Sequence, residues 1–341
     1  MNVKSKRIEA LIKLGDHLRQ FNTNDENYFK LKSIIQKTII YNRWFTFSSI
    51  EESIKTWGST LREKEVEKWS SNYSITKKNN PKTIALILAG NLPMVGFHDL
   101  ICVFISGHNA LVKCASKDLY LLPYMTQFLE HEIGEICFSY TKEVLSNFDA
   151  VIATGSNNAA RYFDHYFSNY PNIIRKNRNG IAILSGKETS KEFDLLGKDI
   201  LQYFGLGCRN VSKLYIPEGF NLDWIFGGLY PLKDVLDHVK YANNYDYNKA
   251  VFLMSEFDFL ENGFLMLRNE PSFSAPISCV HYEYYKSENA LIKHLSDNKE
   301  AIQCTVSKLD INDSIPFGES QRPSLQDYAD KVDTLLFLES I

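Results

Sequence analysis

The sequence has few of the features that mark disordered, membrane-embedded or exported chains. Its 341 residues include only 17 glycines and 10 prolines, while 44% are apolar and 23% are charged, which is typical of a globular chain with a large core. The longest apolar runs, such as Leu100 to Ser106, are far shorter than the roughly 20 residues of a membrane-spanning helix. No apolar stretch follows the basic N-terminus, so we expect a cytoplasmic protein without an integral membrane segment.

The sequence also lacks a large excess of charge of one sign and the Cys and His spacings that are typical of metal sites. The 38 Lys and Arg residues are interspersed with 41 Asp and Glu residues, giving a net charge of −3, so the chain lacks the basic surface that nucleic-acid binding requires. No cysteine pair has C-x-x-C spacing and no histidine pair has H-x-x-x-H spacing. We therefore expect neither a nucleic-acid partner nor a metal site.

Two common catalytic and cofactor motifs are absent as well. No serine lies in G-x-S-x-G, which disfavours a conventional serine hydrolase, and the chain contains no G-x-G-x-x-G. The fold therefore has to be predicted from the spacing of the apolar residues. At about 150 residues per domain, the length of the chain predicts two domains.

The hydrophobic pattern predicts an α/β fold. Residues 1 to about 78 have helical spacing, and a polar break at 77–81 ends this region. From Lys82 short β-rich runs alternate with helical ones, which predicts right-handed crossovers and a Rossmann-type, doubly wound parallel sheet, followed by a second α/β unit. The expected strands are 83–89, 110–113, 133–138, 150–153, 181–184, 212–216 and 250–254, and the expected helices are 93–106, 117–131, 141–147, 157–169, 190–204 and 231–241.

Two turns at predicted strand ends are candidate ligand contacts. Asn91 follows the first strand and precedes Pro93, so its amide could face the crevice at the carboxyl ends of a parallel sheet, or it could simply cap a helix. Gly155 and Ser156 follow another strand and open a helix, the arrangement in which backbone N–H groups and the helix dipole hold a phosphate. A plain turn capped by Ser156 is an equal alternative.

Cys208 stands apart from the other five cysteines. It follows Gly205-Leu206-Gly207, so the backbone can approach a substrate closely, and Arg209 could favour its thiolate. The remaining cysteines, which we interpret as packing residues, are Cys102, Cys114, Cys137, Cys279 and Cys304.

Together these signals resemble the acyl-CoA reductases of the aldehyde dehydrogenase superfamily, which are related to the fatty acyl reductase subunit of bacterial bioluminescence. The resemblance covers about residues 82–341. It rests on five ordered blocks: Ala89-Gly90-Asn91-Leu92-Pro93 with Gly96-Phe97-His98-Asp99, Ala110-Leu111-Val112-Lys113, Thr154-Gly155-Ser156, Gly205-Leu206-Gly207-Cys208-Arg209-Asn210-Val211, and Ile315-Pro316-Phe317-Gly318 continuing to Ser324.

The resemblance implies a role for each matching residue. Cys208 matches the nucleophile that accepts the acyl group, and Asn91 matches the asparagine whose amide, with the backbone N–H at the cysteine, forms the oxyanion hole. Lys113 matches the lysine that touches the adenosine ribose, and Gly155 with Ser156 match the turn above the pyrophosphate. Phe317 lies in the Pro-Phe-Gly turn, which implies a cofactor contact.

The sequence also departs from the family pattern. Aldehyde dehydrogenases carry a water-activating glutamate two residues before a Gly-Gly-Lys motif. In this chain the matching segment ends at Lys187, and Ile183 occupies the position of that glutamate. Glu188 is near but out of register, and it is a candidate acid or base. Glu270 lies in a shifted version of the loop that carries the glutamate for the nicotinamide ribose.

The function that the resemblance implies is NAD(P)H-dependent reduction of a fatty acyl thioester, an acyl-CoA, to the aldehyde through an acyl-cysteine, with NADPH or NADH as cofactor. A cysteine-dependent acyltransferase or thioesterase and a non-catalytic acyl-binding scaffold are alternatives, and a homo-oligomer stays open. We expect a helical region and cofactor domain at 1–186, a catalytic domain at 187–325, and a C-terminal segment at 326–341.

Overall fold

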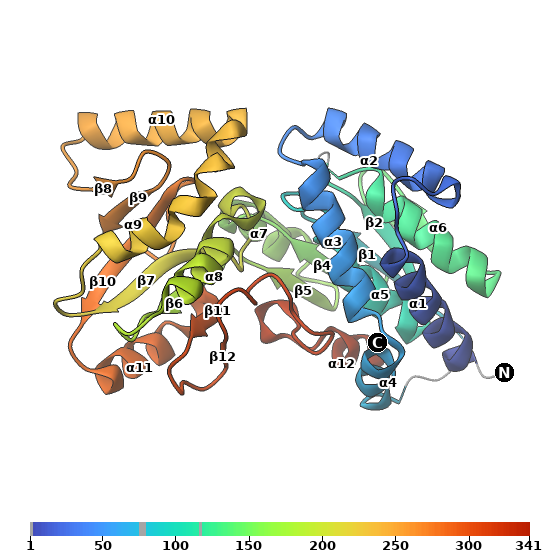
Figure 1. Ribbon diagram of the computed structural model, residues 1–341. Helices are drawn as coiled ribbons and strands as arrows, with labels where there is room; N and C mark the ends of the chain where they lie inside the picture. The colour runs from blue at the N-terminus through green and yellow to red at the C-terminus, as the bar shows by residue number, and fades with distance from the viewer. Residues whose placement is uncertain (1–2, 75–79, 116–117) are drawn as a thin grey trace. The chain divides into compact units, whose positions relative to one another are not determined.

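The computed structural model describes residues 3–74, 80–115 and 118–341, and these divide into two compact units (Figure 1). The first unit comprises Met1–Lys176 with Ser324–Ile341, and the second comprises Asn177–Pro323. The division falls at Lys176 rather than at 186 because the strand that begins at Asn179 joins the sheet of the second unit. The C-terminal segment belongs to the first unit, so the chain returns there after completing the second.

The first unit begins with a helical region, as the sequence predicts. Its buried face is apolar and includes Leu11, Leu14, Ile50 and Ile54. The polar break expected at 77–81 falls mostly outside the described residues. The helices of this region are α1 (Val3–Arg19), α2 (Phe29–Tyr41), α3 (Phe47–Thr60) and α4 (Glu63–Ser71), with a 3-10 turn η1 (Glu26–Tyr28) between the first two.

A parallel five-stranded sheet forms the centre of the first unit. Its order is β3-β2-β1-β4-β5, so the winding direction reverses between β1 and β4, and the doubly wound sheet expected from the sequence is confirmed. The elements are β1 (Thr83–Ile87), α5 (Phe97–Ser106), β2 (Asn109–Lys113), α6 (Leu121–Ile133), β3 (Phe138–Tyr140), β4 (Ala150–Thr154), α7 (Asn157–Tyr166) and β5 (Asn172–Arg175).

The C-terminal segment is fastened to the first unit by buried polar contacts. The Tyr328 hydroxyl lies 2.7 Å from both the Trp69 indole nitrogen and the Tyr73 hydroxyl. Arg175 pairs with the buried Asp99 and donates to Thr334 at 3.0 Å. These contacts hold the last helix, α12 (Thr334–Glu339), which packs on α5 and is preceded by a 3-10 turn η5 (Ala329–Lys331).

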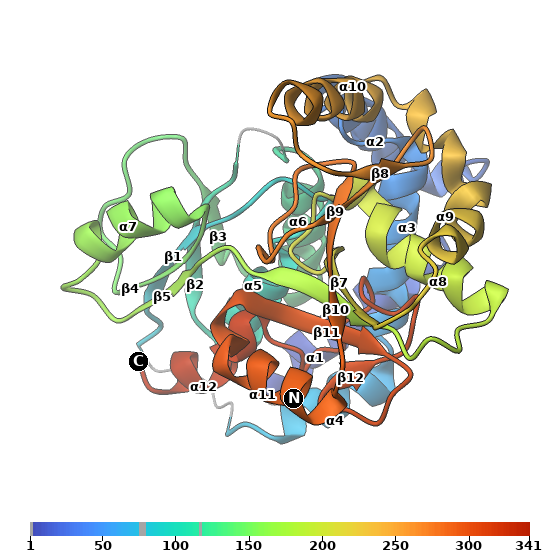
Figure 2. The same ribbon diagram turned by 90° about the vertical axis from the view of Figure 1, so that its left-hand side faces the viewer.

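The second unit is built on a seven-stranded sheet that is parallel except at one edge (Figure 2). Its order is β12-β11-β6-β7-β10-β9-β8, and only the short β8 runs antiparallel to its neighbour. The strands are β6 (Asn179–Ile183), β7 (Val211–Pro217), β8 (Leu260–Glu261), β9 (Met266–Asn269), β10 (Cys279–Tyr285), β11 (Ile302–Ser307) and β12 (Ser314–Ile315). The helices are α8 (Ser190–Leu201), α9 (Asp223–Leu229), α10 (Val239–Met254) and α11 (Glu288–Asp297), with 3-10 turns η2 (Gln202–Gly205), η3 (Tyr230–Asp237) and η4 (Lys299–Ala301).

Several element predictions were wrong in identifiable ways. The apolar run 250–254 is the end of α10 rather than a strand; Phe252 is buried while Leu253 and Met254 are exposed, which is a helical pattern of burial. Residues 141–147 form no helix, and the strand expected at 133–138 lies at 138–140. The expected start of a helix at Lys117 lies outside the described residues, and α6 begins at Leu121.

Candidate active site

Cys208 lies on a sharply turned loop between α8 and β7. Three consecutive residues of this loop, Tyr203, Phe204 and Gly205, have left-handed backbone angles, with φ of 52°, 61° and 73°. A non-glycine residue pays roughly 1–2 kcal/mol for this conformation. The surroundings must therefore hold Tyr203 and Phe204 in place for the loop to keep its shape.

The buried side chain of Asn210 binds the backbone on both sides of these three residues. Its side-chain Nδ2 donates to the backbone carbonyls of Asp199, Ile200 and Gln202, at 3.1, 3.2 and 2.8 Å. Its Oδ1 accepts from the N–H of Gly207 at 2.8 Å. One amide therefore satisfies carbonyls at the end of α8 and fixes the residue that precedes Cys208. The sequence analysis missed this role, because a single asparagine before an apolar strand gives no signal of such bonds.

The Cys208 loop is also joined to the Pro-Phe-Gly turn. The buried carboxylate of Asp199, near the end of α8, accepts from the backbone N–H groups of Gly318 and Ser320 at 2.6 and 3.0 Å. Arg209 donates through Nε to the carbonyl of Ser320 at 2.5 Å. Burial raises the pKa of Asp199, although these backbone donors oppose the rise. Phe317, the predicted cofactor contact, is itself buried within this turn.

Exposure separates Cys208 from the other cysteines. Its side chain is exposed and is not in a disulfide, whereas Cys114 is half-buried and the other four are buried. Burial raises the pKa of the thiols of Cys114, Cys137 and Cys279 to about 12, so these thiols stay protonated at neutral pH. Among the six cysteines, Cys208 is therefore the one most accessible to a reagent in solution.

Glu270, the predicted ribose contact, follows β9 at the carboxyl end of the sheet. Its carboxylate lies 3.0 Å from Arg268, and its backbone carbonyl accepts a hydrogen bond from the ammonium of Lys213. Lys213 is fully buried and also pairs with Glu283 at 2.8 Å. Burial lowers the pKa of Lys213, and the Glu283 carboxylate opposes that effect.

Two further side chains hold the loop after Glu270. Ser212, beside Lys213 on β7, donates to the carbonyl of Phe273 at 2.8 Å. His281 on β10 lies 2.9 Å from the carbonyl of Ser272 through Nδ1, and only a protonated nitrogen can form that bond. Backbone carbonyls at three positions of the 270–273 loop are thus bound by side chains of the sheet, so β7 connects the Cys208 loop to the loop that carries Glu270.

The positions considered for a water-activating base lie at the other end of the sheet from Cys208. Gly180 pairs with Val211, just after Cys208, whereas Ile183 pairs with Tyr215. The four residues from Val211 to Tyr215 span about 13 Å at the usual rise of a strand. Ile183 is fully buried in the core, so its identity carries no information about water activation at Cys208.

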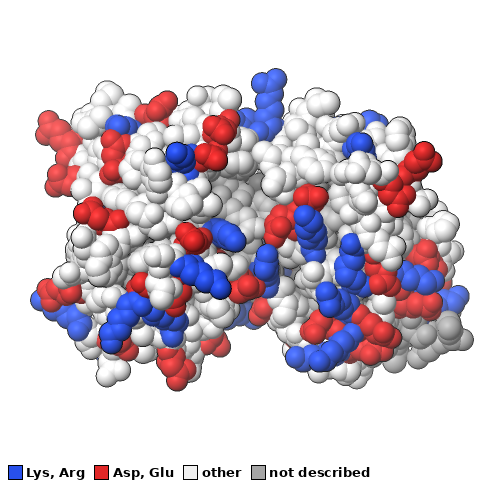
Figure 3. Space-filling model, viewed as in Figure 1, with Lys and Arg blue, Asp and Glu red and all other residues white. Residues whose placement is uncertain are grey.

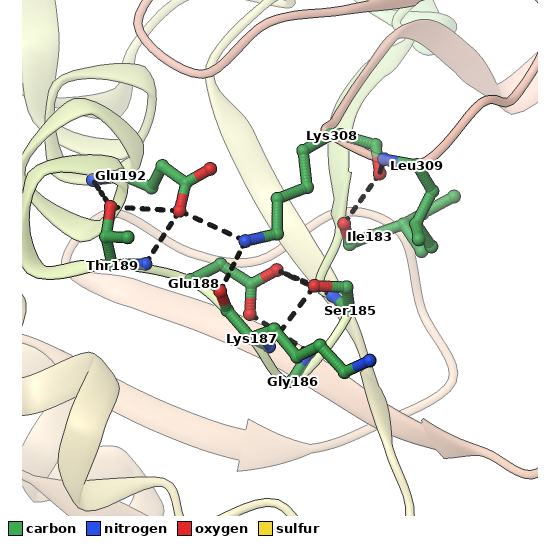
Figure 4. Close-up of polar contacts among 10 residues, drawn as sticks. Ile183, Ser185, Gly186, Lys187, Glu188, Thr189, Glu192, Lys308 and Leu309 are labelled. Carbon is green, nitrogen blue, oxygen red and sulfur yellow. Dashed lines mark hydrogen bonds and ion pairs between the residues drawn. The ribbon is translucent and has the colours of Figure 1, made fainter.

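The carboxylate of Glu188 forms hydrogen bonds within its own turn (Figure 4). It accepts from the backbone N–H and the hydroxyl of Ser185, both at 2.7 Å, and from the N–H of Gly186 at 3.0 Å. Gly186 has a φ of 81°, which makes this turn possible. These contacts favour a structural role for Glu188, and the expectation that it acts as an acid or base has no support in the geometry.

In the first unit, the predicted contacts lie at the carboxyl ends of parallel strands. Asn91 is half-buried in the turn after β1, and Lys113 is the last residue of β2, where its ammonium donates to the carbonyl of Glu143 at 3.1 Å. Gly155 and Ser156 follow β4. Since β1 lies between β2 and β4, the sheet brings these turns to one edge, next to the reversal of winding where open α/β sheets bind ligands.

The turn at Gly155 has a clear structural purpose. Ser156 caps α7 by accepting from the N–H of Ala159 at 3.3 Å, so the capping alternative is confirmed. A Cβ atom on Gly155 would lie 2.9 Å from side-chain carbons of Ala159 and Phe163, both on α7. Glycine is therefore required for close packing of the helix on its own turn, and phosphate binding there stays a prediction.

The described residues contain no group of three metal-binding side chains and no helix long and apolar enough to cross a bilayer. Basic and acidic side chains are intermixed on the face drawn in Figure 3, in agreement with the interspersed charges of the sequence. Lys308 and Glu192, for example, form an ion pair at 3.1 Å.

Comparisons with known proteins identify the fold. No family model matches the chain, and no curated protein matches it. Aldehyde dehydrogenase 21 from Physcomitrella patens, solved with the product succinate, matches at a TM-score of 0.63 and 14% identity over 86% of this chain and 71% of its own. An NAD-dependent aldehyde dehydrogenase from Sinorhizobium meliloti gives 0.66 and 13%, over 96% and 72%.

A third similar structure is the indole-3-acetaldehyde dehydrogenase of P. syringae in complex with NAD+, with a TM-score of 0.64 and 12% identity over 91% of this chain and 77% of that chain. The expected aldehyde-dehydrogenase-like fold is therefore confirmed. At these identities the likeness concerns the fold, and the chemistry of this chain has to be argued from its own residues.

The exposure of Cys208 generates a first prediction. Brief treatment of the native protein with iodoacetamide should alkylate Cys208 at least about tenfold faster than any other cysteine, because the others are shielded and several are held protonated. Peptide mass spectrometry identifies the labelled site, and Cys208→Ser should remove the fast phase. A fast phase that maps to Cys114 or to any other cysteine would contradict the placement of the loop.

Proposed function

We propose that the protein is an NAD(P)H-dependent acyl-CoA reductase that uses Cys208 as its nucleophile. The observation that carries the proposal is an exposed cysteine on a left-handed loop held by a buried amide, within an aldehyde-dehydrogenase-like fold. A cysteine that serves only in packing needs neither exposure nor a strained, anchored turn.

In the proposed reaction the Cys208 thiolate attacks the carbonyl carbon of an acyl-CoA. A bond forms between Sγ and the acyl carbon, the bond to the coenzyme A sulfur breaks, and coenzyme A leaves as a thiolate that takes a proton from water. One thioester replaces another, so the step is nearly balanced in energy. The contribution of the protein is to hold the carbonyl in position and to stabilise the oxyanion.

For the oxyanion we propose the side-chain amide of Asn91 and the backbone N–H at Cys208, the donors that the family resemblance implies. Each such donor contributes roughly 3 kcal/mol in comparable sites. The turn of Asn91 follows a buried strand, which suits a donor that must keep one orientation. The same donors would stabilise the thiohemiacetal anion before it releases the aldehyde and restores the Cys208 thiolate.

The first unit fits a dinucleotide. Its parallel sheet reverses winding between β1 and β4, and the first turn of α7 is exposed at the carboxyl end of β4. We propose that Gly155 and Ser156 adjoin the pyrophosphate and that Lys113 contacts the adenosine ribose. For the second unit we propose contacts from Glu270 and Phe317. When bound, the reduced nicotinamide would supply the hydride that converts the acyl-cysteine into the thiohemiacetal anion.

The structural neighbours favour a nicotinamide enzyme over the alternatives. The P. syringae neighbour was solved with NAD+, and the S. meliloti neighbour is described as NAD-dependent. A cysteine-dependent acyltransferase or thioesterase would use Cys208 without any cofactor. Absorbance of reduced nicotinamide in the presence of acyl-CoA separates the two functions, because a reductase consumes the signal whereas a transferase only releases thiol.

Replacement of the nucleophile gives the second prediction. Cys208→Ala should abolish both labelling of the protein by radioactive acyl-CoA and oxidation of NADPH or NADH, while binding of the nicotinamide, followed by calorimetry, persists. Cys137→Ala, which removes a buried thiol of the first unit, is the matched control and should keep the acylation. Acylation of the Cys208→Ala protein would show that another residue is the nucleophile.

The third prediction concerns the cofactor turn. Enlarging Gly155 would disturb α7 itself, so we choose Asn158, an exposed residue in the first turn of that helix. Asn158→Asp should stabilise the helix through its dipole but repel a phosphate, weakening NAD(P)H binding by about tenfold. Asn289→Asp adds the same charge to the exposed first turn of α11 and should leave binding unchanged. Equal binding by the wild type and Asn158→Asp would rule out a phosphate at this turn.

A further inference from the structure

Asp118 is a buried carboxylate in the segment between β2 and α6. Asp118 is only 1% exposed, and its Oδ2 accepts a hydrogen bond from the backbone N–H of Met94 at 2.9 Å. A second backbone hydrogen bond comes from Leu121, the first residue of α6. One carboxylate therefore binds the turn after β1 and the start of the helix after β2.

The turn after β1 needs such support. Met94 has a left-handed φ of 57°, although it is neither glycine nor asparagine, and its side chain is fully buried. On the other side of the same turn, Ser53 of α3 donates to the carbonyl of Pro93 at 3.0 Å. Asn91, the proposed oxyanion donor, lies in this turn. Ser53 and Asp118 thus hold the backbone at Pro93 and Met94, shortly after Asn91.

The contacts of the Asp118 carboxyl group among the described residues also offset little of the cost of its burial. Its Oδ1 is buried, and no described residue forms a hydrogen bond with it. Among the described residues, the titratable groups influenced by its charge are Cys114 and Tyr140, and burial raises the pKa of each, so both are neutral near pH 7. Burial raises the pKa of Asp118 to about 7, against the effect of its two backbone donors.

We propose that Asp118 is a positioning residue that fixes the Asn91 turn, and that the turn is held more tightly when Asp118 is ionised. The reason is that a carboxylate binds an N–H group about twice as strongly as a neutral acceptor does. The functional part of this inference rests on the proposed acyl-transfer chemistry. The structural part, that Asp118 fixes the backbone at Met94, does not depend on that chemistry.

Hydrogen exchange tests the hold on the turn without any substrate. In Asp118→Ala, the backbone amides within residues 91–96, all but that of Pro93, should exchange roughly ten to a hundred times faster than in the wild type at the same pH, because a buried bond is lost. Asp118→Asn keeps an oxygen that can accept from Met94 and should exchange at a rate between the two. If Asp118→Ala fails to fold, the Asn variant still decides the question.

The matched control is Asp149. It also accepts from a backbone N–H, that of Thr83 at 2.8 Å, but at the amino end of β1 and in an exposed position. Asp149→Asn should leave exchange at 91–96 unchanged. Exchange at 91–96 that is the same in the wild type and in both Asp118 variants would overturn the proposal, whatever the activity of the protein.

Acylation tests the consequence. Coenzyme A release on mixing with acyl-CoA, without reduced nicotinamide, is timed between pH 5.5 and 8.5 for the wild type and for Asp118→Asn. The ratio of the two rates removes the titration of Cys208, which both proteins share. We expect the ratio to rise about fivefold through pH 7, as the wild-type carboxyl ionises. A ratio independent of pH would contradict the role of ionisation.

The two experiments distinguish failure of this inference from failure of the proposed function. If wild-type protein releases no coenzyme A, the acyl-transfer proposal is wrong, and the exchange data alone decide whether Asp118 holds the turn. If acylation occurs but neither exchange nor the rate ratio responds to Asp118, the proposed function survives and Asp118 is not a positioning residue.

Discussion

The candidate nucleophile depends on the bonds of one buried amide. Two non-glycine residues before Cys208, Tyr203 and Phe204, are left-handed, at a cost of roughly 1–2 kcal/mol each. The Asn210 side chain bonds to carbonyls at the end of α8 and to the N–H of Gly207, at roughly 1 kcal/mol per bond, which offsets a strain of that size. Asn210 thus fixes the backbone on both sides of the strained residues, and Arg209 ties the same loop to Ser320.

The same arrangement recurs in the first unit. Met94, close to Asn91, is left-handed and is held by Asp118, as the Cys208 loop is held by Asn210. In both units a buried polar side chain binds the backbone around a strained turn next to a candidate site residue. Backbone strain that the surrounding contacts keep in place is characteristic of functional turns, so Asn210 and Asp118 are the first positions to mutate.

The sequence predicted those parts of the structure that depend on local pattern. Strands such as 150–153 were recognisable because continuous apolar runs end at turn residues. The run 250–254 was misassigned because five apolar residues fit a helix as well as a strand. Ile183 was misinterpreted because its distance from Cys208 depends on the register of β6 and β7, which a motif does not contain. The bonds of Asn210 and Asp118 are likewise invisible without the fold.

The central claim is that Cys208 accepts an acyl group and keeps it until hydride or a thiol arrives. Rapid mixing of the enzyme with acyl-CoA in the absence of nicotinamide tests this claim most directly, with coenzyme A and free fatty acid followed together. We predict a burst of one coenzyme A per chain with little acid, as expected of a reductase that keeps its acyl-cysteine for hydride; a base positioned to activate water would speed deacylation by roughly 10²–10⁴-fold. Continuous acid production without a burst would contradict the account and indicate a thioesterase.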